Sequence, residues 1–110
     1  MNKFFGKSSS ILLFLLIFSS AQAQDVLILY DDSPTNANTV SLSNALTAAG
    51  FNVTISAVSE TNWNNTNPSL TGFEAVVHIN GTTYATGMPA AGQLALVDYV
   101  QNNNGLYIAF

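Results

Sequence analysis

Short apolar runs alternate along the chain with segments that have helical spacing. The run from Val26 to Tyr30 is continuously apolar and is bounded by polar residues. This pattern predicts a strand buried on both faces, as in parallel sheets. Residues 75–79 and 106–110 show the same pattern. Residues 51–58 alternate between apolar and polar side chains, so we expect a half-exposed strand at the edge of a sheet.

Two segments predict helices. Residues 38–49 carry four apolar side chains at helical spacing, Leu42, Ala45, Leu46 and Ala49. Asn36 or Asn38 would cap the start of this helix, and Gly50 would form a left-handed cap at its end. Pro89 suits the first turn of a second helix over residues 89–101. Its apolar side would be formed by Leu94, Leu96, Val97 and Val100.

The order of these elements predicts an α/β fold with three layers and a parallel, flavodoxin-like sheet in the strand order 2-1-3-4. The helix 38–49 would cover one face of the sheet. The helix 89–101 and the segment 59–73 would cover the other, with Trp63 folded over the sheet rather than stacked on a sugar. Nothing after the fourth strand would cover it, so we expect a domain truncated there, the front part of a longer protein.

The N-terminus has the features of a secretory signal peptide. Lys3 and Lys7 give it a basic start, residues 11–18 are apolar, and Ala21-Gln22-Ala23 is a small-x-small cleavage pattern. The apolar run is too short to span a bilayer, which takes about 20 residues. We therefore predict a cleaved signal over residues 1–23 and an exported domain over residues 24–110. The protein would reside in the periplasm, at the cell surface or in the medium.

Charge and cysteine content exclude several function classes. Residues 24–110 keep all six acidic residues and neither of the two basic ones. Nucleic acid is excluded as a partner, because its binding rests on cationic contacts to phosphates. Insertion into a membrane after signal cleavage is not expected either. The chain has no cysteine, which excludes disulfides, thiolate metal sites and a cysteine nucleophile from these residues. No cofactor is predicted.

The topology predicts where a ligand would bind. In open α/β sheets, ligands bind beyond the carboxyl ends of the strands, where the strand order reverses. In the order 2-1-3-4 this point lies between strands 1 and 3, so the loops that follow those strands should be neighbours. We predict a shallow ligand-binding crevice lined by Asp31, Asp32, Ser33, Asn80, Thr82, Thr83 and Tyr84.

The chemistry within this crevice is open to two interpretations. Asp31 and Asp32 could bind Mg²⁺ or Ca²⁺ through their oxygens. We prefer the interpretation that Asp32 or Asn36 caps the loop and the helix while Asp31 is solvated, and we assign no metal ligand. His78, the single histidine, is expected to be a core or strand-end residue with a hydrogen-bonded ring. No G-x-S-x-G motif accompanies it, so no catalytic residue is assigned.

Four stretches carry a resemblance to a known family: "VLILYDD", "LSNALTAAGFNVT", "PSLTGFEAVVHING" and "QLALVDYVQNNNGLYIAF". Together they resemble the N-terminal part of the trehalose-utilisation (ThuA-like) branch of the class I glutamine-amidotransferase-like fold. The branch often has a histidine just after the fourth strand, where this chain has Phe110. The cysteine nucleophile of true amidotransferases sits on a later elbow, so the resemblance implies a fold and transfers no catalytic residue.

These observations predict a non-catalytic binding or scaffold module of a larger secreted or cell-surface protein. Its expected partners are a carbohydrate or another small polar ligand and the downstream domains of the same chain. The alternative is the N-terminal part of a secreted carbohydrate-active enzyme. In that case the acid and base would be divided between the Asp31–Asp32 loop and residues beyond 110.

Overall fold

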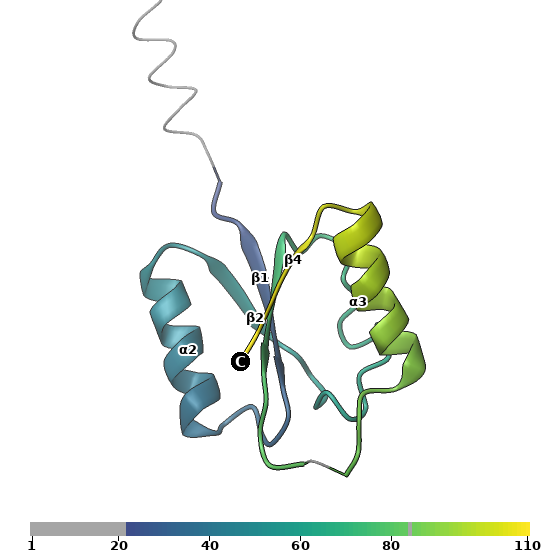
Figure 1. Ribbon diagram of the computed structural model, residues 1–110. Coiled ribbons are helices and arrows are strands. Elements are labelled where there is room, and N and C mark those ends of the chain that lie inside the picture. Colours follow the sequence, from purple (N-terminus) through teal and green to yellow (C-terminus); the bar gives the residue numbers. More distant parts are fainter. Residues whose placement is uncertain (1–21, 84) are drawn as a thin grey trace, which may run out of the picture.

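The computed structural model describes residues 22–83 and 85–110 (Figure 1). Tyr84 and residues 1–21 of the predicted signal peptide lie outside these described residues. Within them, no helix has the length and apolar character needed to cross a membrane. The predicted order of elements is confirmed: β1 (Asp25–Tyr30), α2 (Ala37–Ala48), β2 (Asn52–Ile55), β3 (Ala75–Ile79), α3 (Ala90–Asn102) and β4 (Leu106–Ala109).

The four strands form one parallel sheet in the predicted order β2-β1-β3-β4. Register partners on neighbouring parallel strands share a face of the sheet. Leu27, Val76 and Tyr107 therefore lie on one face, and Val77 and Ile108 lie on the other. The expected edge position of β2 is confirmed, because among the described strands β2 pairs only with β1.

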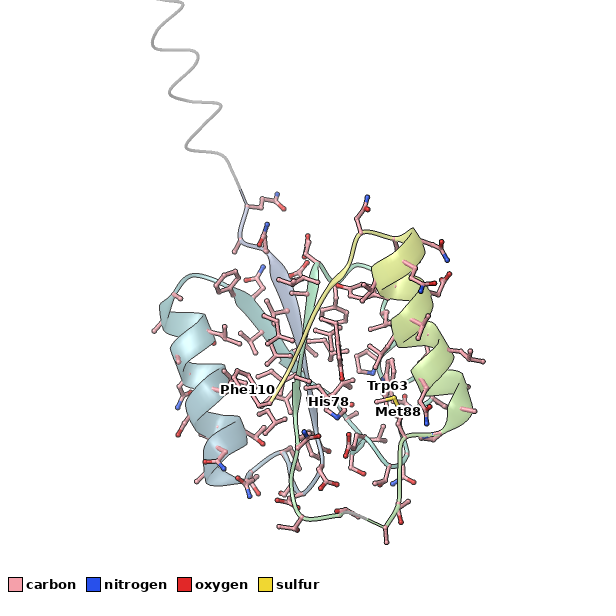
Figure 2. All side chains as sticks on the ribbon, viewed as in Figure 1. Trp63, His78, Met88 and Phe110 are labelled. Carbon is pink, nitrogen blue, oxygen red and sulfur yellow. The ribbon has the colours of Figure 1, made fainter. Side chains whose placement is uncertain are left out.

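The two helices lie on opposite faces of the sheet, as predicted (Figure 1). The core lies between the sheet and α3, and consists of Leu27, Leu29, Trp63, Leu70, Val76, Leu96 and Tyr99. Trp63 is 0% exposed, and its Nε1–H donates to the carbonyl of Pro68 over 2.9 Å. Figure 2 shows Trp63 in the layer between the sheet and α3. Trp63 thus folds over the sheet, and its indole is not available for stacking on a sugar.

Helix α3 packs through a different stripe from the one predicted. Gly92, Leu96 and Tyr99 are buried, whereas Leu94 is 70% exposed and Val97 is also exposed. A Cβ atom on Gly92 would lie 2.4 Å from the carbonyl oxygen of Trp63. The helix therefore approaches Trp63 through glycine. The side of α3 that faces the core is therefore the one that carries Gly92, and not the one with the most aliphatic side chains.

Helix α2 covers its face of the sheet less completely. Asn36 caps its start by accepting a hydrogen bond from the backbone N–H of Asn38 over 2.9 Å. Gly50 has the positive φ expected of a left-handed cap, 97°. Thr39 is the buried residue of this helix. Because α2 lies over β1 and β2, Ile108 on the same face of β4 is left exposed.

The connection from β2 to β3 contains no helix or strand over residues 56–74, all of which the structure describes. Polar bonds hold it in place instead. The hydroxyl of Ser56 donates to the carbonyl of Val58 over 2.7 Å. The backbone N–H of Glu60 donates to the carbonyl of Tyr30 over 2.7 Å. This last bond fixes Glu60 beside the carboxyl end of β1.

Candidate functional site

The loops after β1 and β3 are neighbours, as the topology predicts. The backbone N–H and the hydroxyl of Thr82 donate to Oδ1 of Asp32 over 3.1 and 2.9 Å. The backbone N–H of Thr83 donates to Oδ2 of Asp31 over 2.7 Å. The two carboxylates therefore bind the opposite loop directly.

A glycine allows this close approach. A Cβ atom on Gly81 would lie 2.6 Å from Oδ1 of Asp32 and 2.7 Å from Oδ2 of Asp31. The space left between the loops, which we call the Asp31 hollow, has a volume of about 20 Å³. A space of that size holds about one water molecule or one ion. The loops therefore leave no room here for an organic ligand.

Asp31 does not have the solvated environment that the sequence suggested. Asp31, expected to be solvated, is only 6% exposed, whereas Asp32 is exposed. Burial alone would raise the pKa of Asp31. Hydrogen bonds from Thr83 and from the backbone of Gly81, with the nearby His78, outweigh that effect and lower the pKa. Asp31 is therefore a buried carboxylate that stays ionised.

The other predicted crevice residues are less closely joined. The hydroxyl of Ser33 pairs with the hydroxyl of Thr35 over 2.9 Å, within its own loop. Asn80 lines the Asp31 hollow, and its backbone N–H donates to the carbonyl of Phe110 over 3.3 Å. Tyr84 lies outside the described residues. The structure thus brings together the aspartates with Gly81, Thr82 and Thr83.

A larger pocket, which sequence reasoning missed, lies beside α3. This α3 pocket has a volume of about 480 Å³. Its lining consists of Glu60, His78, Gly87, Met88, Gln93, Leu96, Val97, Val100, Gln101 and Tyr107. Figure 2 shows His78 on the sheet and Met88 across from it, on the side of the sheet that faces α3. The pocket therefore has mainly apolar walls and a polar end at Glu60, His78 and Tyr107.

The three polar residues at that end form a hydrogen-bonded chain. Nε2 of His78 contacts Oε2 of Glu60, and Nδ1 lies 2.7 Å from the hydroxyl oxygen of Tyr107. A carboxylate only accepts hydrogen bonds, so in the neutral imidazole Nε2 carries the proton and Nδ1 accepts from Tyr107. The ring of His78 is hydrogen-bonded at both nitrogens, which agrees with the expectation for this residue.

This chain presents an acceptor to the pocket. Burial, and to a smaller extent the charge of Glu60, raise the pKa of Tyr107. The phenol therefore stays protonated at neutral pH, and its hydrogen points to His78. Its oxygen is left with a free lone pair that a hydroxyl or amine of a ligand can donate to. Among the residues that the structure describes, the pocket lining includes no serine, threonine or cysteine that could act as a nucleophile.

The sequence held only a weak signal for this site. Glu60 lies in a polar segment without periodicity, and its position depends on the bond from its backbone to Tyr30. His78 and Tyr107 share a face only because of the register between β3 and β4. If the register had been known, the alternation of side chains along each strand would have predicted that His78 and Tyr107 lie together. A single apolar run does not reveal the register.

Comparison with known proteins adds no relative. The chain matches no protein-family model, no curated protein and no solved structure.

Proposed function

We propose that residues 24–110 form a binding module whose ligand occupies the α3 pocket. One observation carries this proposal: an apolar pocket of about 480 Å³ ends at an acceptor, the hydroxyl oxygen of Tyr107, which the Glu60–His78–Tyr107 chain fixes. Apolar pockets with a few convergent polar groups are the usual form of a small-molecule site. The Asp31 hollow, at about 20 Å³, is too small for such a ligand.

The chemistry of the α3 pocket defines the class of ligand. Tyr107 offers an acceptor, and Gln93 and Gln101 of α3 add side-chain amide groups to the lining. The carboxylate of Glu60 repels anions, and residues 24–110 contain no lysine or arginine to offset it. We therefore propose a neutral compound that has an apolar face and at least one hydroxyl group. Sugars belong to this class, in agreement with the expected carbohydrate partner.

The proposal also includes export from the cytoplasm and a ThuA-like fold. The basic start, short apolar run and Ala21-Gln22-Ala23 pattern support a secretory signal over residues 1–23. The parallel sheet in the order β2-β1-β3-β4 is compatible with a ThuA-like domain at the level of fold class. The module would then bind its ligand outside the cytoplasm, as part of a secreted or cell-surface protein.

The proposal is tested by comparing three probes. Cyclohexanol and methyl β-D-glucoside are neutral and hydroxylated, and cyclohexanecarboxylate is a charged counterpart of the first. We expect the purified protein to bind at least one neutral probe in ligand-observed NMR, and the carboxylate at least tenfold more weakly. Tyr107→Phe should weaken binding of the neutral probe about tenfold, the effect of losing roughly one hydrogen bond.

Tyr99→Phe is the matched control. The hydroxyl of Tyr99 donates to the carbonyl of Phe73 over 2.7 Å, but Tyr99 does not line the α3 pocket. Its removal should cost stability and leave affinity unchanged. Binding of none of the probes, or equal effects of the two substitutions on affinity, would overturn the proposal.

One observation favours a second candidate, a secreted carbohydrate-active enzyme. Glu60 orients the imidazole of His78 as a carboxylate orients a general base. Under this reading the remaining catalytic groups lie outside the α3 pocket. Hydrolysis of 4-nitrophenyl glucoside that Glu60→Gln abolishes would favour the enzyme, whereas the binding proposal expects no turnover.

A further inference from the structure

Asp31 has an oxygen that the fold leaves without a partner. Its Oδ2 accepts from Thr83, but its Oδ1 is buried and has no hydrogen-bond partner among the described residues. The residue as a whole is only 6% exposed. Burial of a carboxylate oxygen without a partner costs free energy, because no hydrogen bond compensates for its desolvation.

The space beside this residue has room for one ion or one water molecule. Asp31 lines the Asp31 hollow, whose volume is about 20 Å³. The other lining side chains that carry oxygen atoms are Asp32, Asn36, Asn38, Thr39 and Asn80. Carboxylate and amide oxygens are the ligands that hard cations prefer.

The charges around the hollow favour a cation over an anion. Asp31 and Asp32 are neighbours in the chain, and both carboxylates lie close to Gly81. A side chain on Gly81 would collide with them. The basic residues of the chain are Lys3 and Lys7, which belong to the predicted signal peptide. The first turn of α2 also lies at the hollow, and its positive end would favour an anion. An anion there would have to face two carboxylates, so we expect their charge to dominate.

We propose that the Asp31 hollow binds one divalent hard cation, of the Ca²⁺ and Mg²⁺ class, through Oδ1 of Asp31. Asp32, at the exposed side, supplies a second carboxylate, and Asn80 supplies an amide oxygen. Water completes the coordination shell. Because the cation would join the loops after β1 and β3, it would tie the two ends of the central strands together. This site is separate from the α3 pocket and does not depend on the function proposed for that pocket.

Calorimetric titration of the purified protein with CaCl₂ and with MgCl₂ tests this proposal, in 150 mM NaCl and at pH 7. We expect one ion per chain and a dissociation constant in the range of roughly 10⁻⁴–10⁻³ M, typical of extracellular modules. Asp31→Asn keeps the shape of the side chain and removes its charge, and it should weaken binding at least tenfold. Asp98→Asn is the control, because Asp98 is an exposed carboxylate that bonds to Asn102 and Asn103.

A second measurement protects the test against a variant that does not fold. Amide NMR spectra of the unchanged protein with added CaCl₂ or MgCl₂ should show shifts concentrated at residues 31–39 and 79–83. Absence of binding by both ions at 10 mM would overturn the proposal. So would shifts located elsewhere, or equal affinities for the unchanged protein and Asp31→Asn.

Discussion

The Asp31 hollow and the α3 pocket lie in the same small domain but differ in how closely the elements around them approach each other. At the hollow, the loops after β1 and β3 bind each other through Asp31, Asp32, Thr82 and Thr83, and little space remains. At the pocket, α3 packs on the core through Gly92, Leu96 and Tyr99, and the space beside this contact stays open.

The comparison shows that proximity of polar loops does not by itself leave room for an organic ligand. The hollow stands where an α/β sheet normally places its ligand, but its hydrogen-bonding groups are largely used by the protein itself. The pocket has fewer polar groups, and the chain of Glu60, His78 and Tyr107 leaves one acceptor unused. A small organic ligand needs open volume as well as chemistry, and of these two spaces the α3 pocket combines both.

The largest loss of stability is expected at the part of α3 that belongs both to the core and to the wall of the α3 pocket. Leu96 is 9% exposed, and Leu96→Ala should lower the free energy of unfolding by about 2–4 kcal/mol. Leu94, on the same helix, is 70% exposed, so Leu94→Ala should change it by less than about 0.5 kcal/mol. Urea denaturation measures both. Similar losses for the two variants would show that α3 does not pack through the Leu96 side.

A smaller effect is expected where α3 touches Trp63. Gly92→Ala places a methyl group 2.4 Å from the carbonyl oxygen of Trp63, and α3 must move away. We expect a loss of about 1–3 kcal/mol in urea denaturation, although alanine favours helices more than glycine does. Gly87→Ala is the matched control, because its added Cβ would meet nothing within 4 Å. A more stable Gly92→Ala variant would contradict this contact.

The smallest effect concerns acid stability at the hollow. The pKa of Asp31 is lowered from its ordinary value of 3.8, so its ionised form stabilises the folded state above that pH. This contribution is lost as the pH falls below 3.8 and through the lowered pKa. Asp31→Asn should therefore lose less stability than the unchanged protein between pH 5 and pH 2. Urea denaturation at the two pH values measures this, and an identical loss would mean that Asp31 is not held ionised.

The sequence was informative where a single element decides the outcome. The apolar runs and their order predicted the sheet β2-β1-β3-β4, and the topology predicted that the loops bearing Asp31 and Thr83 meet. It was less informative where two elements decide together. Leu94, Val97 and Val100 recur at helical spacing, and so do Gly92, Leu96 and Tyr99. The second set is buried, and its Gly92 lies against the backbone of Trp63.

The environments of the site residues also depend on tertiary contacts, as the buried side of α3 does. Asp31 is buried because the loop around Gly81 closes over it, and nothing in the pair Asp31–Asp32 indicates which member that would be. The α3 pocket depends on the rotation of α3 and on the position of Glu60, which a backbone bond to Tyr30 fixes. Neither follows from periodicity.

The most direct test of the account is a map of where a neutral hydroxylated probe binds. Cyclohexanol is titrated into the purified protein while amide NMR shifts are recorded. We predict that the largest shifts fall on Glu60, His78 and Tyr107 and on residues 93–101 of α3. Largest shifts at residues 31–33 and 80–83 would instead place the ligand between the loops and contradict the central claim.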